Sequence, residues 1–411
     1  MVKSIQNHSS TAGTNLEHAR SHNRRAVLEA VRLAGSLSRA EIARRTSLTI
    51  QTISNIVTEL EDKGLLLAGE INRNPRGQPS IPYSINPKGA SSIGFHIARH
   101  EIIGVLTDLT GKVLAQKEVE AEATTPQIAT PIVTRMFDEL IKTARVSKRS
   151  LLGAGVALPA RFGLGTLSTE GPTGLPGWND AAVRRAFAKE LDVPVFIEND
   201  AVAAAIGEHH YGAARGINNF VMLYLDEGLG AGLFLNGHLF KGALSNAGEI
   251  GHMIIEANGR QCPCGNRGCL ERYVSLQAAF EFFKASGRHK ISSPRDVANL
   301  SSQDLKAWIL DAAPKLAIAV NILETVLDAE TIIIGGLASV DIVESLIEES
   351  LPLHISASAR PDRKFPRVMS GRVGRDATAL GAAALPIFDE MNPNFDVLLK
   401  QSLPVVAALQ F

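Results

Sequence analysis

The sequence predicts an α/β body with two lobes, preceded by a small helical module that ends in a β-hairpin. From residue 91 onward, three apolar strand patterns precede a long helical one, and a second group of strands followed by helices begins near residue 219. Residues 23–64 instead show three short helical patterns, and a turn-rich basic stretch follows them. A chain of 411 residues is long enough for two or three domains with cores of their own.

The overall composition is that of an ordinary soluble protein, with 45% hydrophobic and 20% charged residues. No apolar run reaches the roughly 18 residues that span a bilayer, and the opening MVKSIQNHSS lacks the apolar core of a secretory signal. We therefore expect a cytoplasmic protein with no membrane partner.

The charges are distributed unevenly, although the formal net charge is +0. Residues 1–90 hold 12 Lys and Arg against 7 Asp and Glu, a net charge of +5, so the remainder of the chain carries −5. A basic head on an acidic body favours a nucleic-acid-binding module joined to a part that does not bind nucleic acid. The alternative is a chance fluctuation in a short segment.

The first two helical patterns predict a compact core. The first pattern places four apolar side chains on one side: Val27, Leu28, Val31 and Leu33. The second begins with Ser38 and Glu41 at the spacing of a capping box, in which both side chains bond free backbone N–H groups.

The third helical pattern has the composition of a DNA-recognition helix. Thr49 can cap it, and its apolar residues recur at helical spacing: Ile50, Ile53, Ile56, Val57 and Leu60. Its other face is short-chained and uncharged: Gln51, Thr52, Ser54, Asn55 and Thr58. Such a face suits base edges in a major groove, whereas an ordinary solvated face usually carries Lys and Glu. We predict DNA contacts from Thr49, Gln51, Thr52 and Asn55.

A β-hairpin wing is predicted after this helix. Two short apolar runs flank the basic, Gly/Pro-containing tip NRNPRGQPS, where Arg73 and Arg76 can reach phosphates or the minor groove. Together these elements predict a winged helix-turn-helix over residues 23–88, after a flexible arm at 1–22 and before a linker at 86–89.

The body begins with the strand patterns SIGFHIA, EIIGVLTDL and GKVLAQKEV and a helix from about Pro126 to Val146. The second group consists of the patterns FVMLYLD, AGLFLNG and HMIIE, later followed by long helices and the buried strand TIIIGG at 331–336. Two such halves predict two lobes with a cleft between them.

All three cysteines lie within eight residues, as Cys262, Cys264 and Cys269. An odd, clustered set without an export signal indicates a metal rather than disulfides. Zn²⁺ prefers four tetrahedral ligands, and His252, ten residues before Cys262, is the natural candidate for the fourth. Four protein ligands leave no open position, so the zinc is predicted to be structural.

Several motifs together resemble those of the ROK family of repressors and sugar kinases. They are Glu198-Asn199-Asp200-Ala201, Gly248-Glu249-Ile250-Gly251-His252, the cysteine motif from Cys262 to Glu271, and Gly335-Gly336-Leu337. The resemblance covers residues 20–390 and implies the actin-like ATPase fold. Lobe 1 is then expected at 89–200, completed by a C-terminal helix at about 376–411, and lobe 2 with the zinc loop at 201–375.

The resemblance also implies a sugar site. Its candidate residues are Asn199, Asp200, Glu249, His252, Glu271 and Arg161. Carboxylates and amide or imidazole groups of this kind grip sugar hydroxyls. Asp200 matches the kinases' base, and His252 also matches their zinc ligand. The segment at 171–180 resembles a sugar-facing loop, although Gly174 stands where the family usually has Asn.

The phosphate-binding motifs of the family's kinases are altered. The first, Asp-x-Gly-x-Thr, reads His96-Ile97-Ala98-Arg99-His100, and the second, Gly-Thr-Gly, reads Asp226-Glu227-Gly228. Side chains fill positions that need bare backbone, and two carboxylates would repel a triphosphate. Only Gly335-Gly336 remains, so we predict that the chain has no catalytic residues and no kinase activity.

The sequence therefore predicts a sugar-responsive transcriptional regulator, most simply a repressor that binds a pseudo-palindromic operator as a homodimer, with further pairing to a tetramer left open. Two alternatives remain. One is an active sugar kinase with a regulatory DNA-binding domain, and the other is a repressor controlled by a protein such as a phosphotransferase component docking near the zinc loop.

Overall fold

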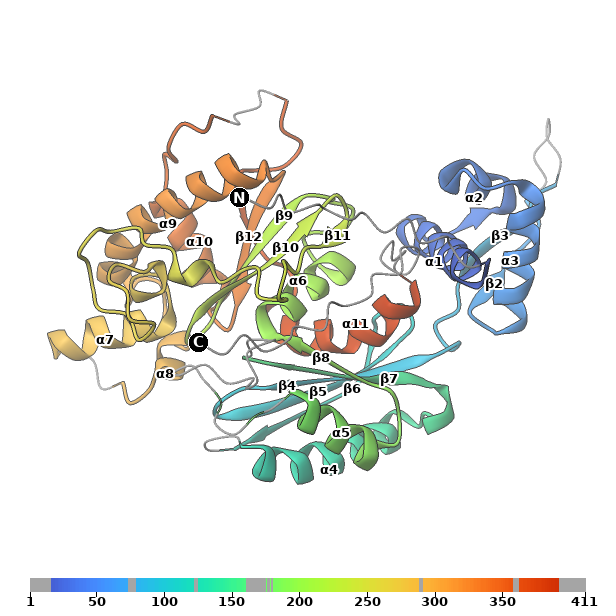
Figure 1. The fold of residues 1–411 in the computed structure, drawn as a ribbon, viewed down its shortest axis with the longest axis horizontal. Coiled ribbons are helices and arrows are strands. Elements are labelled where there is room, and N and C mark those ends of the chain that lie inside the picture. The colour runs from blue at the N-terminus through green and yellow to red at the C-terminus, as the bar shows by residue number, and fades with distance from the viewer. Residues whose placement is uncertain are drawn as a thin grey trace, which may run out of the picture. The chain divides into compact units, whose positions relative to one another are not determined.

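The computed structural model describes residues 16–72, 79–121, 125–159, 175, 178, 180–287, 291–357 and 362–391. The chain divides into two compact units (Figure 1). One is residues 90–387, the body, and the other is residues 1–89 with 388–411, the N-terminal unit.

The N-terminal unit is a winged helix-turn-helix. Its elements are α1 (Leu16–Ala34), β1 (Leu37–Ser38), α2 (Arg39–Thr46), α3 (Ile50–Asp62), β2 (Leu66–Ala68) and β3 (Pro82–Ile85). The three strands form an antiparallel sheet in the order β1-β3-β2, and a bridge between Asn72 and Ser80 extends the hairpin. The predicted capping box is confirmed, because Ser38 and Glu41 bond each other's backbone N–H groups at the start of α2.

Two expectations for α1 need correction. The helix begins at Leu16, so part of the predicted arm at 1–22 is helical. Val27, Leu28 and Val31 are fully buried, but Leu33 is 41% exposed. Leu33 lies two residues after Val31, which is about 200° around a helix of 3.6 residues per turn, so it points away from the core.

The body contains two five-stranded sheets with the same design. The first has the order β6-β5-β4-β7-β8, and the second has the order β11-β10-β9-β12-β13. Their bounds are β4 (Ser91–Ile97), β5 (Glu101–Asp108), β6 (Val113–Glu120), β7 (Leu151–Leu158), β8 (Val195–Asn199), β9 (Phe220–Leu225), β10 (Leu229–Leu235), β11 (His238–Leu239), β12 (Thr331–Gly336) and β13 (Val368–Ser370). In each sheet an antiparallel trio adjoins a parallel trio through a shared strand, β4 or β9. This duplication confirms the predicted two-lobed α/β fold.

Helices cover these sheets. They are α4 (Pro126–Ala144), α5 (Asp180–Leu191), α6 (Asp200–Tyr211), α7 (Leu276–Ser286), α8 (Pro294–Ala298), α9 (Lys306–Leu327), α10 (Val340–Glu349) and α11 (Ala377–Met391). In Figure 1, α4 and α5 lie on one face of the first sheet, while α6 and α11 lie on the side toward the second sheet. Each sheet has its own apolar core, with Phe95 and Trp178 in one and Leu223 and Trp308 in the other.

Small residues bring α11 very close to its neighbours. A Cβ built on Gly155 of β7 would lie 1.8 Å from the carbonyl oxygen of Ala382, and one on Gly381 would lie 1.7 Å from that of Ala203 in α6. The predicted C-terminal helix therefore starts as expected at Ala377 and is seated between the first sheet and α6. Its predicted extension over 392–411 lies outside the described residues.

One predicted strand is wrong. The segment HMIIE forms no regular strand: the 3-10 turn η2 (Ile250–His252) comes first, and Ile254 then makes a single bridge to Cys269. Ile254 is 57% exposed, because this segment bridges to Cys269 of the cysteine loop and does not pair within a sheet. Among the described residues, the helices include none with both the length and the apolar character needed to cross a membrane.

Candidate functional site

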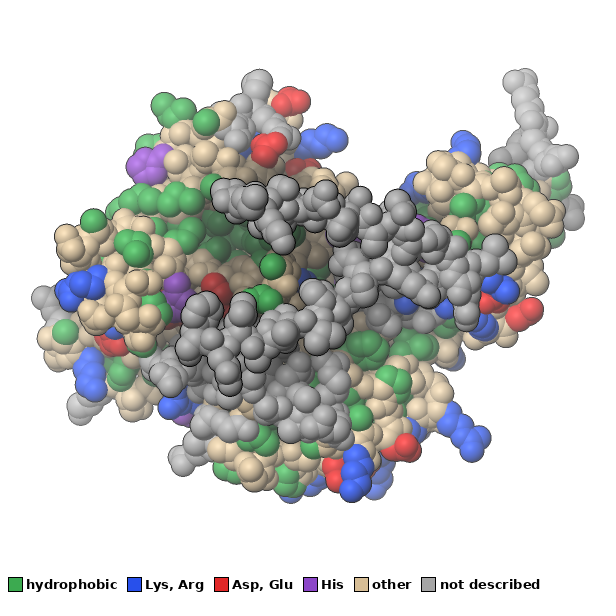
Figure 2. Space-filling view, in the orientation of Figure 1, with side chains coloured by type: hydrophobic (Ala, Val, Ile, Leu, Met, Phe, Trp, Pro, Cys, Tyr) green, Lys and Arg blue, Asp and Glu red, His purple; other side chains and the backbone are tan. Residues whose placement is uncertain are grey.

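The outer face of α3 carries the residues predicted to read DNA. Thr49 caps the helix by accepting the N–H of Thr52 at 3.2 Å, as predicted. Gln51 and Asn55 are exposed one turn apart, and their side-chain amides lie 3.4 Å from each other, Gln51 Nε2 to Asn55 Oδ1. Figure 2 shows the visible surface of this unit as mostly uncharged. The face can therefore present amide and hydroxyl groups to base edges without repelling phosphates.

The negative charge of Glu59, on the same helix, is balanced by basic neighbours. Glu59 accepts hydrogen bonds from Lys63 and Arg20, both at 2.8 Å, which lower its pKa to about 2. Ile50 was grouped with the core residues, but it is 54% exposed at the first turn of α3. An exposed apolar side chain there can contact a thymine methyl group. Arg73 and Arg76 lie outside the described residues.

The cysteine loop has the geometry of a four-ligand metal site. The ligand atoms of His252, Cys262, Cys264 and Cys269 all lie within 4.8 Å of one another. Cys262 Sγ is 3.7 Å from His252 Nδ1, and Cys264 Sγ is 3.7 Å from Cys269 Sγ. In a zinc tetrahedron with Zn–S bonds of about 2.3 Å, sulfur atoms lie ~3.8 Å apart. The donor set therefore fits a tetrahedral metal ion.

Short backbone contacts hold this loop in place. Bridges join Ile254 to Cys269 and Gln261 to Arg267, and the N–H of Cys262 donates to the carbonyl of Asn266 at 2.9 Å. These contacts bring His252 back to the cysteines across ten residues.

Two predicted sugar contacts, Glu249 and Glu271, lie beside the metal ligands. His252 Nε2 faces Glu249 Oε2 at 3.8 Å, while its Nδ1 faces Cys262. Glu271, in the turn η3 (Leu270–Arg272), accepts the N–H of Leu229 at 3.0 Å. Gly248 precedes Glu249 with a φ of 104°, and a Cβ there would lie 2.0 Å from the carbonyl oxygen of Ala231. Only glycine permits this close turn.

Asn199 and Asp200 stand where β8 ends and α6 begins. Asn199 Oδ1 caps the helix by accepting the N–H groups of Ala201 at 2.9 Å and Val202 at 3.2 Å. Asp200 Oδ1 accepts the N–H of Ala201 at 2.8 Å. Burial, together with the nearby carboxylates of Asp226 and Glu249, raises the pKa of Asp200 to about 7. Asp200 is thus close enough to Asp226 and Glu249 for their negative charges to affect its pKa.

The two altered phosphate turns face each other across the lobes. The turn between β4 and β5 contains Arg99 and His100, and the turn between β9 and β10 contains Asp226 and Glu227. His100 Nε2 lies 3.9 Å from Glu227 Oε1. Burial, together with the nearby carboxylate of Asp226, raises the pKa of Glu227 to about 7. Side chains, not bare backbone, therefore meet at this position.

Ion pairs fasten the same region. Arg295 of α8 and Arg375, in the turn η4 (Gly374–Asp376), both pair with Glu101 of β5, and Arg375 also reaches Glu118 at 2.7 Å. Sequence reasoning missed this cluster, because its members come from four separate segments. It also missed the 2.5 Å ion pair between Lys241 and the motif residue Glu198.

Arg161 and most of the predicted sugar-facing loop at 171–180 lie outside the described residues. Among the described body residues, the structure brings five predicted contacts into two neighbouring groups. Glu249, His252 and Glu271 surround the metal loop, and Asn199 and Asp200 lie at α6. The cleft between the lobes remains a prediction.

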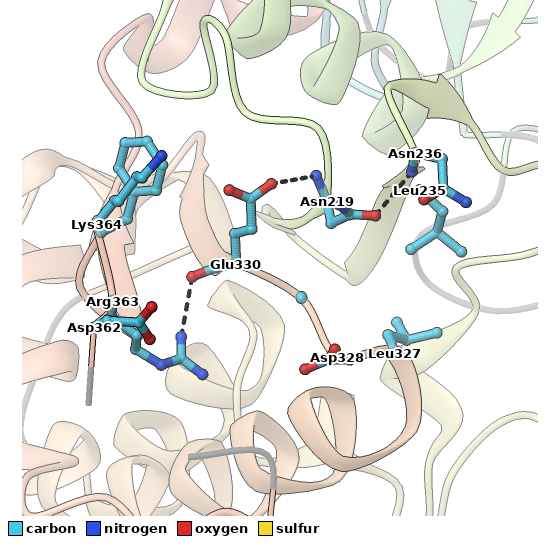
Figure 3. Close-up of a pocket in the computed structure, with 11 residues that line it drawn as sticks. Asn219, Leu235, Asn236, Leu327, Asp328, Glu330, Asp362, Arg363 and Lys364 are labelled. Carbon is cyan, nitrogen blue, oxygen red and sulfur yellow. Dashed lines mark hydrogen bonds between the residues drawn. The ribbon is translucent and has the colours of Figure 1, made fainter. Parts of the chain in front are cut away.

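A separate polar cavity of about 540 Å³ lies elsewhere in lobe 2 (Figure 3). Asn219 precedes β9 and Glu330 precedes β12, so the cavity lies at the opposite ends of these strands from Asp226. Glu330 Oε1 accepts the N–H of Asn219 at 3.0 Å, and its backbone carbonyl accepts from Arg363 at 3.0 Å. The polar groups of Glu330 and Arg363 are thus already engaged within the wall.

The fold and the site define a DNA-binding regulator built on a sugar-kinase-like body. The ROK family profile matches residues 92–387, and a winged helix-turn-helix DNA-binding profile matches residues 20–66. The chain belongs to the ROK family.

Known transcriptional regulators and a known sugar kinase resemble this chain. The xylose repressor of Bacillus spizizenii is 29% identical over 371 residues, which are 89% of this chain and 94% of that protein. A crystal structure of a ROK family transcriptional regulator, a homologue of the Escherichia coli MLC protein, has a TM-score of 0.72 at 24% identity and covers 93% of this chain and 99% of that one. A ROK hexokinase from Thermus thermophilus has a TM-score of 0.58 at 24% identity, covering 74% and 100%. The last two share the fold.

Proposed function

We propose that this chain is a cytoplasmic, sugar-responsive transcriptional repressor that reads operator DNA as a homodimer and binds a sugar without phosphorylating it. The observation that carries the proposal is the combination of a winged helix-turn-helix with a ROK body whose sugar motifs are present while both phosphate turns carry side chains. Xylose is the first sugar to test, because a repressor named for it matches most of the chain.

The sugar-side residues supply complementary hydrogen-bonding groups. Glu249 and Glu271 offer carboxylate oxygens to hydroxyl donors, and His252 Nε2 points toward Glu249. Because Asn199 Oδ1 already caps α6, its amide nitrogen is the group that would donate to a sugar oxygen. Arg161 remains a proposed contact.

Zinc is the proposed structural ion of the loop. His252 Nδ1 and the thiolates of Cys262, Cys264 and Cys269 would hold it. A four-ligand zinc ion supplies folding energy and fixes the orientation of its ligands. Binding through Nδ1 leaves Nε2 facing Glu249, so the loop would orient the sugar-side groups.

The absence of kinase activity is inferred from the phosphate turns. A triphosphate would meet the carboxylates of Asp226 and Glu227 on one side and the side chains of Arg99 and His100 on the other. Repulsion between like charges in a poorly screened site amounts to several kcal/mol.

The rival function is an active sugar kinase, favoured by one observation. Asp200 matches the kinases' base, and its pKa of about 7 suits proton abstraction near neutral pH. A nucleotide-binding measurement separates the two functions.

The repressor proposal is tested on DNA. An operator is selected from randomised duplexes, and its affinity is measured by fluorescence anisotropy with and without xylose and other sugars. We expect one sugar to shift the operator affinity at least about fivefold, the lower end of usual coupling energies. If a phosphotransferase protein, and not a sugar, regulates this repressor, no sugar will change its affinity for the operator.

A pair of variants tests the proposed DNA contacts of helix α3. Asn55→Ala should weaken operator binding by roughly 1–3 kcal/mol, because a bidentate contact to a base is lost. Glu61→Ala, on the same helix near its other end, should bind as the unchanged chain does. Equal affinities for the two variants would contradict the assignment of Asn55.

A further inference from the structure

His96 is a buried histidine whose ring has no partner. It lies on β4, only 4% exposed, between the fully buried apolar residues Phe95 and Ile97. Neither Nδ1 nor Nε2 has a hydrogen-bond partner in the described part of the chain. A buried polar group without a partner destabilises the fold, so the ring favours a ligand.

Two carboxylates face this ring from other elements. One ligand atom each from His96, Asp200 and Asp226 lies within 4.8 Å of the others. His96 comes from β4 in the first lobe, Asp200 opens α6, and Asp226 follows β9 in the second lobe. These three residues are far apart in the sequence, and the fold brings them together.

Each carboxylate is held in place by a second group. Asp200 accepts the N–H of Ala201 at 2.8 Å. Asp226 accepts the N–H of Glu227 at 2.7 Å and the hydroxyl of Tyr224 at 3.0 Å. Outer hydrogen bonds of this kind orient the carboxylates that bind metal ions.

We propose that His96, Asp200 and Asp226 bind a divalent first-row transition-metal ion such as Mn²⁺. The ion would give the unpartnered imidazole of His96 a bond and would balance the negative charges of the two neighbouring carboxylates. One imidazole with two carboxylates suits Mn²⁺, Fe²⁺ or Zn²⁺ better than Mg²⁺, which prefers an all-oxygen set. Ligands at about 2.0–2.2 Å from one ion lie ~3 Å apart, which is compatible with ligand atoms that already lie within 4.8 Å of one another.

This site is distinct from the cysteine loop and goes beyond the proposed repressor function. It occupies the position of the altered phosphate motifs, where His96 and Asp226 stand in place of Asp and Gly. A three-ligand ion keeps open positions, which a water or a sugar hydroxyl can fill. Because its ligands come from both lobes, the ion would also resist their separation.

The test is a Mn²⁺ titration of the full chain, purified with zinc in its cysteine loop and free of DNA and sugar, followed by electron paramagnetic resonance of the unbound ion. We expect one bound Mn²⁺ per chain. The variant Asp226→Asn should weaken it at least about tenfold. Glu227→Gln, which changes the adjacent carboxylate, should keep the affinity within about twofold.

Fold integrity is checked by zinc content and the thermal midpoint of each variant. His96→Leu provides a second ligand loss that keeps the site apolar and filled, and it should abolish binding as well. Failure of the unchanged chain to bind Mn²⁺ or a second Zn²⁺, or equal binding by Asp226→Asn and Glu227→Gln, would overturn the proposal. Neither result bears on operator binding, so the two proposals fail separately.

Discussion

The two sides of the body differ in what their motifs retain. On the sugar side, Gly248, Glu249, His252 and Glu271 keep the family's residues, and the turn at Gly248 still needs glycine. On the phosphate side, Ala98 and Asp226 stand where the kinase motifs have glycine, and His100 and Glu227 stand where they have threonine. The strands beneath are nevertheless paired in the same order in both lobes.

On the proposed account, the chain keeps the fold of the family while its phosphate turns lose the kinase chemistry. Both turns still close with ordinary backbone bonds, Ala98 N–H to Glu101 carbonyl at 2.9 Å and Asp226 N–H to Gly228 carbonyl at 3.0 Å. Replacing glycine in such turns therefore leaves the sheets intact while it changes what can bind above them. Substitutions on either side test whether sugar binding and nucleotide binding separate in this way.

The largest effect is expected in the cysteine loop. Cys269→Ser replaces a fully buried ligand, so zinc should be lost and the body should be destabilised by several kcal/mol. Sugar binding should disappear with it, because His252 and Glu271 lose their support. Zinc content, thermal unfolding and calorimetry measure these three effects.

Arg267→Ala is the matched control in the same loop. Arg267 is exposed, and within the described part of the chain its guanidinium donates to the side chain of Gln261 at 3.1 Å. It should retain zinc and sugar. Full sugar binding by the zinc-free Cys269→Ser protein would show that the loop does not order the sugar side.

A smaller effect separates the two sides directly. Glu249→Gln should weaken sugar binding roughly tenfold to a hundredfold, because it removes a charged acceptor of hydroxyl hydrogen bonds. Glu227→Gln, an identical change on the phosphate side, should alter sugar affinity less than about twofold. Calorimetric titration with the sugar measures the affinity of both variants. A larger loss of affinity in Glu227→Gln than in Glu249→Gln would contradict the division into two sides.

The smallest effect is expected from partial repair of the phosphate side. Arg99→Gly removes one side chain from the first turn, yet Asp226 and Glu227 remain, so no nucleotide binding should appear. Stability should change by about 0.5 kcal/mol or less, as is usual for surface substitutions. Saturable ATP binding by this variant would show that one side chain alone blocks the site.

The sequence predicted local features well. The capping box at Ser38 and the cap at Thr49 depend on residues three apart, and both are present. The cysteine spacing likewise places three thiols in one loop, and a single histidine nearby completes the set.

Features that depend on distant segments could not be read in this way. The pattern HMIIE looks like a strand, but its partner is the single residue Cys269 rather than a neighbouring strand. The sequence presents His96 only as a substituted aspartate, because Asp200 and Asp226 lie more than a hundred residues along the chain. The available signal is a lone histidine between the apolar residues Phe95 and Ile97.

The most direct test of the central claim is a pair of titrations on one preparation of the unchanged chain, first with the responsive sugar and then with Mg-ATP, followed by an assay for sugar phosphate. We predict saturable heat with the sugar, none with Mg-ATP and no phosphorylated product. Saturable binding of Mg-ATP together with transfer of phosphate to the sugar would contradict the account.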